Sequence, residues 1–282
     1  MGNNSIRSNL GKDDILSEID LTIKADISRE KTFLVLEGWD DIAFFHGKTG
    51  SSVELFESFS GKDGVVEIVK HFSNKRVLGV CDRDYVNNSQ CDEIFYYDFN
   101  CLEIMLASND SSFRAVVNVH YYGDLECSEL RLSILEDLKF LSYTRKLNAI
   151  NAWGLVLTGI SFNKVYDARS KRLSYAKLIQ QLEKLNPNLL CNHQEKIDLA
   201  NEMCTKKIGE LDYFQITQGH DFISCLQCHC LGSIFGKKKK PSCGSLFDCL
   251  LSAYSLETFR GTELYKNVNR YQYNNSIDEI FI

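Results

Sequence analysis

The chain has 282 residues, 44% of them hydrophobic and 25% charged, and its formal net charge at pH 7 is −6. Such a chain holds one large domain or two ordinary ones, and its composition excludes a disordered protein. The acidic balance excludes a protein that binds polyanions over its whole surface. Contact with nucleic acid therefore requires a local basic patch, or metal ions that bridge carboxylates and phosphates.

The sequence contains neither a signal-peptide pattern nor an uncharged stretch of about 18 apolar residues. We therefore expect a cytoplasmic protein with no membrane partner. The eleven cysteines are irregularly spaced in a long chain, so reduced thiols are expected.

Strands and helices alternate over the first third of the chain. Residues 12–30 carry apolar side chains at spacings of three to four, which predicts an amphipathic helix that packs on the sheet. Short apolar runs predict strands at residues 33–36, 53–58, 77–81 and 94–97. Helical patterns lie between and after these strands, so we expect an α/β fold, a Rossmannoid parallel sheet with flanking helices.

Carboxylates follow several of the predicted strands directly. Glu37 follows the first strand, Asp82 and Asp84 follow the third, and Asp98 follows the fourth, with Glu103 in a helix that opens beside it. The carboxyl ends of parallel strands lie at one edge of a sheet, where ligands commonly bind. We therefore expect these acids to meet in space.

The segment after Glu37 permits a plainer interpretation. Gly38 allows the backbone to turn sharply, and Asp40 or Asp41 can begin the helix that follows, because a carboxylate at a helix start accepts unpaired N–H groups. On this interpretation the acids of the segment are helix caps and turn residues.

Several carboxylates in one crevice repel one another unless a cation joins them. Mg²⁺ (or Mn²⁺) suits oxygen ligands that leave room for water and phosphate oxygens, and two such ions can clamp the reacting oxygens of a phosphodiester. Asp82 and Asp84 would hold metal, and Glu37 would act as general acid or base.

The alternation fades beyond about residue 110, and the remainder is predicted to be mainly helical. Residues 128–139 and 175–185 are expected helices, the second closed by Pro187, and residues 152–157 are either a strand or a buried helix. Basic side chains with interleaved tyrosines form either a nucleic-acid surface or a solvated helix face; they are Lys164, Arg169, Lys171, Arg172 and Lys177.

Three features near the C-terminus stay open. Gln218-Gly219-His220-Asp221 precedes the cluster Cys225, Cys228 and Cys230. One Cys-x-x-Cys without a second ligand pair disfavours a structural zinc site, so we expect Cys225 and Cys228 to be buried on one helix face with Phe222. The run Lys237–Lys240 is expected to be an exposed loop, with phosphate contact or partner docking as the alternative.

The strand-end acids resemble a known signature. Residues 36–41 and 79–84, Leu-Glu-Gly-Trp-Asp-Asp and Gly-Val-Cys-Asp-Arg-Asp, resemble the TOPRIM domain of topoisomerases, primases and OLD-family nucleases, with its Glu-Gly-x-x-Asp turn and later Asp-x-Asp. The sequence Asp-Arg-Asp-Tyr at 82–85, the spacing from Asp98 to Glu103 and the later Gly-His-Asp are similar to the AriB family, the effectors of PARIS anti-phage defence systems. The resemblance covers about residues 30–110 and beyond that rests on residues 219–221.

The resemblance implies a TOPRIM-like catalytic domain at residues 31–115, after an N-terminal helix within 1–30 and before a C-terminal region at 116–282 for substrate, dimer or partner contacts. It implies a toxin nuclease that a partner ATPase of the ABC/SMC-like kind inhibits, and that cleaves transfer RNA, as a homodimer, once released. The chain itself lacks the Gly-x-x-x-x-Gly-Lys-Ser/Thr phosphate loop, so a nucleotide-driven step belongs to another chain.

Carried over by position, the resemblance gives each acid a role. Glu37 is the catalytic carboxylate; the metal ligands are Asp41, Asp82, Asp84 and Glu103. Asp98, His220 and Asp221 support the site, with a helix cap as the plain alternative for the last two. Two other functions remain open, a DNA nuclease or nickase of the OLD type, and a catalytically idle binding module.

Overall fold

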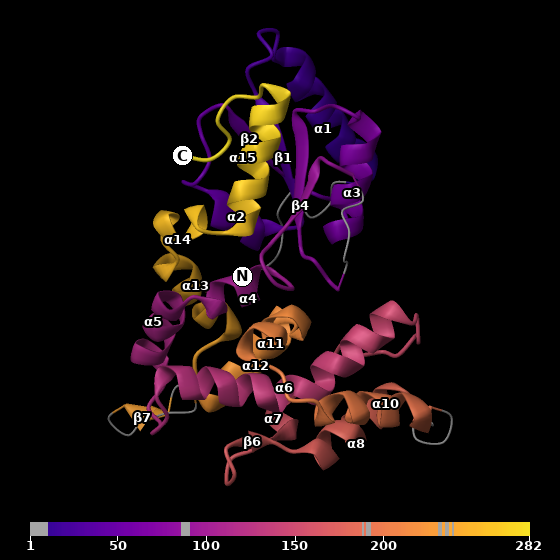
Figure 1. Ribbon diagram of the computed structural model, residues 1–282, viewed down its shortest axis with the longest axis vertical. Helices are drawn as coiled ribbons and strands as arrows, with labels where there is room; N and C mark the ends of the chain where they lie inside the picture. Colours follow the sequence, from indigo (N-terminus) through magenta and orange to yellow (C-terminus); the bar gives the residue numbers. More distant parts are fainter. Residues whose placement is uncertain are drawn as a thin grey trace. The chain divides into compact units, whose positions relative to one another are not determined.

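The computed structural model describes residues 11–85, 91–187, 189, 193–230, 233–234, 237–238 and 240–282 (Figure 1). The chain divides into two compact units. The first comprises the residues up to Asp98 together with Leu256–Ile282, and the second is Phe99–Ser255.

A four-stranded parallel sheet forms the centre of the first unit. Its strand order is β2-β1-β3-β4, and every neighbouring pair is parallel. All residues of β1 and β3 are buried, as expected for a parallel sheet that helices cover on both faces. The predicted α/β class is therefore confirmed, with strands β1 (Thr32–Leu36), β2 (Val53–Glu57), β3 (Val77–Cys81) and β4 (Ile94–Tyr96).

Two helices cover one face of the sheet, α1 (Lys12–Ala25) and α3 (Gly61–Phe72) (Figure 1). Ile15 and Ile19 of α1 pack in one buried cluster with Phe33 of β1 and Ile68 of α3. Gly79 of β3 allows α3 to approach closely, because a Cβ at this position would lie 2.6 Å from a methyl carbon of Val65. The packing of the first helix on the sheet is thus as predicted.

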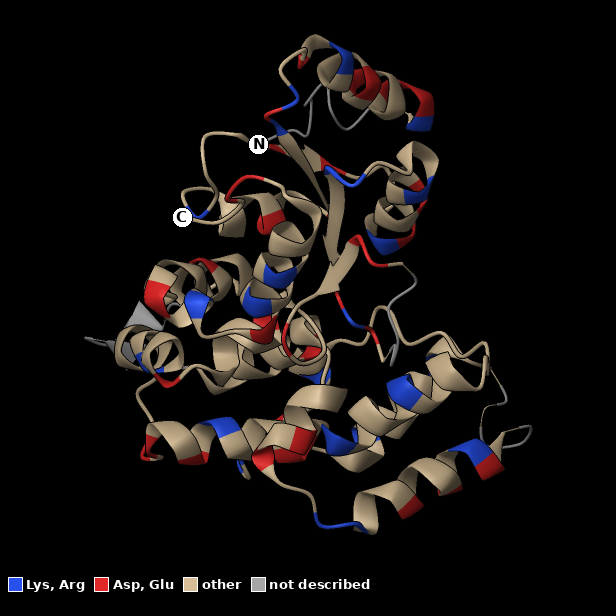
Figure 2. Cartoon of the chain, turned by 45° about the horizontal axis from the view of Figure 1, so that its top comes forward, with Lys and Arg blue, Asp and Glu red and all other residues tan. Residues whose placement is uncertain are grey.

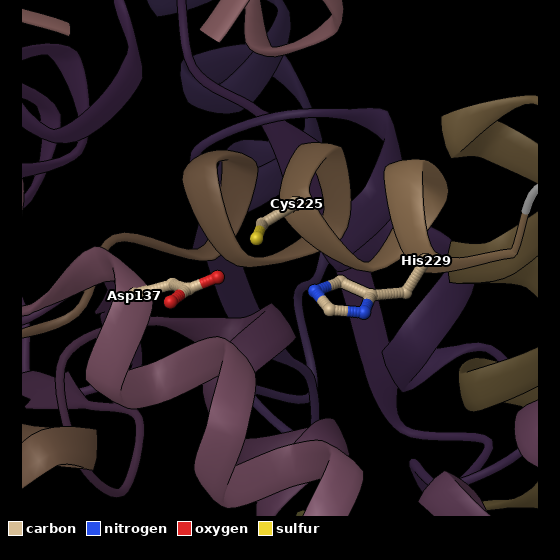
Figure 3. Close-up of side chains that lie close together, drawn as sticks. All are labelled: Asp137, Cys225 and His229. Carbon is tan, nitrogen blue, oxygen red and sulfur yellow. The ribbon is translucent and has the colours of Figure 1, made fainter. Parts of the chain in front are cut away.

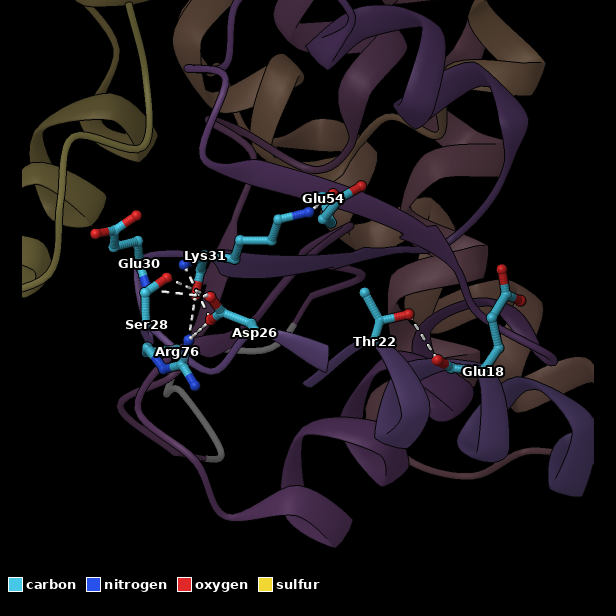
Figure 4. Close-up of polar contacts among 8 residues, drawn as sticks. All are labelled: Glu18, Thr22, Asp26, Ser28, Glu30, Lys31, Glu54 and Arg76. Atoms are coloured by element: carbon cyan, nitrogen blue, oxygen red, sulfur yellow. Dashed lines mark hydrogen bonds and ion pairs between the residues drawn. The ribbon is translucent and has the colours of Figure 1, made fainter. Parts of the chain in front are cut away.

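The first helix is shorter than predicted. It ends at Ala25 rather than at residue 30, and Ile27 beyond it is 90% exposed. Asp26 turns the chain here: its carboxylate accepts the backbone N–H groups of Glu30 and Lys31 and pairs with Arg76, which lies just before β3 (Figure 4). A tertiary ion pair therefore overrides the helical pattern of the sequence.

Aromatic side chains fill the opposite face of the sheet. Phe45 of α2 (Trp39–Phe45) stacks on Tyr97 and on Phe281, and Phe44 meets Tyr97 and Phe259 edge to face. Helices α14 (Leu256–Arg260) and α15 (Glu263–Asn275) thereby join the first unit. The first unit ends at Asp98, and the chain returns to it at Leu256. The predicted division into a catalytic domain at 31–115 and a contact region at 116–282 stays a prediction.

The described part of the second unit is mainly helical, as predicted. Buried side chains of α6 (Cys127–Ile150) pack against α10, α11 and α12. The predicted helix 128–139 lies within α6, and 175–185 coincides with α8. The other elements are α4 (Leu102–Ser108), α5 (Asp110–His120), α7 (Phe162–Val165), β5 (Tyr166–Asp167), β6 (Arg172–Leu173), α8 (Tyr175–Leu185), α10 (Gln194–Thr205), α11 (Glu210–Ile216), α12 (Gly219–His229), β7 (Ser233–Ile234), β8 (Lys237–Lys238) and α13 (Cys243–Ala253).

Residues 152–157 form neither a strand nor a helix, so both predictions for them were wrong. Leu155 exchanges backbone hydrogen bonds with the side-chain amide of Asn148, and Val156 does so with Asn186. These side-chain amides take the place of a neighbouring strand as hydrogen-bond partners of the backbone N–H and C=O groups.

Among the described helices, none is both long and apolar enough to cross a membrane.

Candidate active site at the carboxyl edge of the sheet

Glu37 and Asp82 meet at the carboxyl edge of the sheet. Each follows the last residue of a strand, and the two strands, β1 and β3, are parallel neighbours. The backbone N–H of Asp82 donates a hydrogen bond to Oε1 of Glu37 at 2.5 Å, across 45 residues of sequence. The predicted convergence of the first two acidic motifs is confirmed for this pair.

The carboxylate of Glu37 lies among backbone groups at the start of α3. Gly61 has a φ of +52°, and a Cβ there would lie 3.5 Å from Oε2 of Glu37. The backbone N–H of Lys62 also interacts with this carboxylate. Burial raises the pKa of Glu37, and the negative charge of Asp84 raises it further, whereas the N–H groups of Asp82 and Lys62 work against the rise. The net shift is upward, so Glu37 holds a proton more readily than an exposed glutamate does.

The turn after β3 has an unusual backbone. Asp84 and Tyr85 are consecutive residues in the left-handed region, with φ values of 45° and 69°. Non-glycine residues in this conformation are strained and concentrate at functional sites. Lys62 stabilises this turn. Its ammonium group donates to the backbone oxygen of Arg83 at 2.8 Å and lies 3.7 Å from a carboxylate oxygen of Asp84.

Lys62 was not among the residues that the sequence predicted for this site; it is the second residue of α3. The signal was present, because β2 ends at Glu57 and a parallel strand delivers the residues that follow it to the same edge as Glu37 and Asp82. The side chain of Lys62 is only 15% exposed. A mostly buried ammonium group beside Asp84 therefore belongs to the candidate site.

Asp41 caps the helix that follows Glu37. Its Oδ2 accepts the backbone N–H of Gly38 at 3.1 Å, and its Oδ1 accepts the hydroxyl of Tyr97 at 2.5 Å. The side chain is buried at the third position of α2. These contacts match the helix-cap interpretation, and the metal-ligand role of Asp41 stays a prediction.

Asp98 also has a structural contact. Its two carboxylate oxygens accept the backbone N–H groups of Glu263 and Leu264 at 3.0 and 2.9 Å. A carboxylate in this position stabilises the first turn of α15. The predicted support of the other acids by Asp98 stays a prediction.

Glu103 and the Gly-His-Asp segment lie together within the second unit. Glu103 is in the first turn of α4, and its Oε1 lies 3.4 Å from Nδ1 of His220. A Cβ on Gly219 would lie 2.3 Å from Oε2 of Glu103. Glycine has no Cβ, so it fits at this position without that clash. The side chain of His220 is 91% exposed, whereas that of Glu103 is 14% exposed.

Asp221 forms an ion pair rather than a helix cap. Its carboxylate accepts two hydrogen bonds from Arg145 of α6, from Nε at 2.5 Å and from Nη2 at 2.9 Å. The side chain of Asp221 is 7% exposed and that of Arg145 is 19% exposed. The three residues of the Gly-His-Asp segment thus differ in their surroundings. Gly219 lies against Glu103, His220 is exposed, and Asp221 forms an ion pair that joins α12 to α6.

The short distance between Gly219 and Glu103 predicts how a substitution of this glycine changes the stability of the protein. Gly219→Ala is expected to lower the free energy of unfolding by about 1–3 kcal/mol, because Glu103 must move away from the new methyl group. The matched control is Gly244→Ala in the first turn of α13, where the nearest neighbour of a new Cβ is 3.8 Å away. Urea denaturation compares the two; equal effects would contradict the packing argument.

The predicted basic residues are exposed, but they do not form a purely basic surface. Arg172 pairs with Asp137 and lies 3.8 Å from Glu136, and Lys171 lies 3.5 Å from Asp124. Figure 2 shows Lys and Arg mixed with Asp and Glu along the helices. Nucleic-acid contact by Lys164, Arg169, Lys171, Arg172 and Lys177, all exposed, stays a prediction.

The lysine run is not simply a loop. Lys237 and Lys238 form the short strand β8, paired with β7, so the loop prediction is corrected for these two residues. Lys240 donates to the side-chain oxygen of Asn163. Lys239 lies outside the described residues.

No protein-family model and no curated protein matches the chain. The resemblance to TOPRIM domains is therefore carried by the acidic motifs and their spacing alone.

Proposed function

We propose that the chain is a Mg²⁺-dependent TOPRIM nuclease of the AriB type, an effector of anti-phage defence. The observation that carries the proposal is the hydrogen bond between Glu37 and Asp82, which joins the two acidic motifs at one sheet edge. Lys62 and the strained turn at Asp84 and Tyr85 support it, because both lie beside these acids.

The residues present suit a hard divalent cation. Asp84 raises the pKa of Glu37 through its negative charge, and such repulsion between carboxylates is what a bound cation relieves. Asp82 and Asp84 would hold the ion, and the resemblance adds Asp41 as a further ligand of the same unit; the ligand role that it gives to Glu103 stays a prediction. Mg²⁺ or Mn²⁺, when bound, neutralises charge on the phosphodiester that is cleaved.

Two residues of the chain could transfer the protons and stabilise the negative charge that hydrolysis requires. Glu37 has a raised pKa, so it can take a proton from the attacking oxygen and return one to the leaving oxygen. The ammonium of Lys62 is fixed by Arg83 and Asp84 and can stabilise negative charge that develops on the phosphate.

Transfer RNA is the proposed substrate, and release from an inhibitory ABC/SMC-like ATPase, followed by homodimer formation, is the proposed activation. Basic, exposed side chains of the second unit, such as Lys164 and Arg169, would contact the RNA backbone. Such contacts depend on salt, so activity is expected to fall as the salt concentration rises.

The test is cleavage by the purified chain of total tRNA, unstructured RNA and single- and double-stranded DNA, with Mg²⁺, Mn²⁺ or a chelator. We expect cleavage of tRNA that the chelator abolishes. Asp82→Asn keeps the backbone N–H that binds Glu37 and is expected to lower the rate at least about 100-fold. The control is Asp92→Asn, an exposed carboxylate just before β4.

Chelator-resistant cleavage, or an Asp82→Asn variant as active as the control, would contradict the metal-ligand role. Preferential cleavage of DNA would keep the nuclease assignment and overturn the proposed substrate.

A further inference from the structure

Three side chains of different chemistry face one another between α6 and α12 (Figure 3). Cys225 and His229 are four residues apart on α12 and so lie on one face of the helix. Asp137 of α6 points toward them (Figure 3). One ligand atom from each residue lies within 4.8 Å of the other two. All three residues belong to the second unit.

Two side chains of the cluster are buried, and the third carries a buried ring nitrogen that lacks a partner among the described residues. Cys225 is fully buried, and the side chain of Asp137 is 3% exposed. Nε2 of His229 is buried without a hydrogen-bond partner among the described residues. Figure 3 shows a ring nitrogen of His229 directed at Cys225 and Asp137. Buried polar atoms are rarely left without a partner, and a bound ion can supply one.

The surroundings fix the protonation state of His229 and the orientation of Asp137, whereas burial raises the pKa of the Cys225 thiol. Burial and the positive charges of Arg172 and Lys171 lower the pKa of His229 to about 4, so the ring is neutral at physiological pH. Asp137 is oriented by Arg172, which pairs with Oδ1, and by the backbone N–H of Leu173, which donates to Oδ2 at 3.0 Å. Outer hydrogen bonds of this kind hold metal-binding carboxylates and histidines in place.

We propose that Asp137, Cys225 and His229 bind one Zn²⁺ ion. A sulfur, a nitrogen and an oxygen donor together suit zinc, whereas Mg²⁺ and Ca²⁺ prefer oxygen ligands alone. Cys225 gives its proton to solvent as it binds and becomes a thiolate ligand. This site is separate from the proposed Mg²⁺ site, and its occupancy does not depend on the proposed nuclease function.

Three protein ligands leave the fourth position of a tetrahedral zinc ion open. His229 also lines a pocket of about 190 Å³, together with Tyr121, Tyr166 and Lys171. Asp137 and Cys225 are not among the residues that line this pocket. The ion would also join the end of α12 to α6, while Asp221 and Arg145 join the beginning of α12 to the same helix.

The predicted burial of Cys225 and Cys228 on one helix face with Phe222 is confirmed. However, Cys228 Sγ lies 3.7 Å from the side-chain oxygen of Asn163 and is not part of the cluster. The partner of Cys225 is His229, one position further along α12.

The test uses the full-length chain, stripped of metal with a chelator and titrated with Co²⁺ as a spectroscopic substitute for Zn²⁺. We expect saturation at one equivalent, a thiolate-to-cobalt charge-transfer band and the intense visible bands of four-coordinate cobalt, all displaced by Zn²⁺. Protein purified without chelators is expected to contain about one zinc ion per chain by elemental analysis.

The variants identify the ligands. Cys225→Ser is expected to abolish the charge-transfer band, and His229→Gln to weaken Co²⁺ binding at least about 10-fold. Cys228→Ser is the matched control on the same helix and is expected to bind as the parent chain does. Circular dichroism checks that each variant is folded.

Two results would overturn the proposal without reference to any variant's stability. They are the absence of the charge-transfer band in the parent chain, and the absence of zinc in the purified protein together with no Co²⁺ binding. An unchanged band in folded Cys225→Ser, or its loss in folded Cys228→Ser, would also overturn the assigned ligand set.

Discussion

Glu37→Gln is expected to abolish cleavage, with a loss of at least about 1,000-fold in rate, and to end the growth arrest caused by producing the chain in cells. Glutamine can still accept the N–H of Asp82, but it cannot take up and release a proton. The substitution therefore removes the chemistry and preserves much of the local structure.

The stability of this variant separates catalysis from folding. The pKa of Glu37 is raised in the folded chain, so its contribution to stability is fully present below the pKa of the unfolded chain and is lost as the pH rises through the folded value. At neutral pH the buried charge of Glu37 lowers the stability of the folded chain, and glutamine removes this charge. Glutamine also loses one hydrogen bond, which acts in the opposite direction. We expect the free energy of unfolding of the metal-free protein to change by less than about 1.5 kcal/mol.

Glu67→Gln is the matched control, because Glu67 is a half-exposed carboxylate on the outer side of α3 that pairs with Lys12. It is expected to retain full activity. A Glu37→Gln variant that is folded and as active as Glu67→Gln would remove Glu37 from the catalytic site.

Asp221→Ala is expected to have the largest effect on stability, a loss of about 3 kcal/mol in the free energy of unfolding of the second unit. The substitution leaves the guanidinium of Arg145, 19% exposed, without its two carboxylate contacts. Asp198→Ala on α10 is the control, since Asp198 is exposed; its effect is expected to be within about 0.5 kcal/mol.

Urea denaturation followed by the fluorescence of Trp153 measures this effect. Trp153 lies in the second unit and Trp39 in the first, so a Trp39→Phe background reports the second unit alone. The Arg145→Ala and Asp221→Ala substitutions together are expected to cost less than the sum of the single effects, because each alone removes the same pair. Additive effects would show that the interaction between Arg145 and Asp221 makes no contribution of its own to the free energy of unfolding.

Local patterns predicted the sheet well. The five apolar residues of β3 and the helix α8 were predicted with their observed bounds, because short buried strands and capped helices are recognisable in local sequence. The early end of α1 could not be predicted, since it depends on Arg76, 50 residues beyond Asp26. The irregular segment around Leu155 and Val156 likewise depends on amide side chains from other elements.

The candidate site was predictable only where the sheet topology determines it. Glu37 and Asp82 follow neighbouring parallel strands, so their meeting follows from the strand order. The Asp137, Cys225 and His229 cluster was not predictable, because nothing in the local sequence places α6 against α12. The pairing of Asp221 with Arg145 was missed for the same reason.

The most direct test of the central claim is to sequence the ends of total RNA and DNA from cells that produce either the parent chain or Glu37→Gln at equal levels. The proposed function predicts new ends in transfer RNA with the parent chain and none with Glu37→Gln. New RNA or DNA ends that persist with Glu37→Gln, or growth arrest without new ends in any nucleic acid, would contradict it.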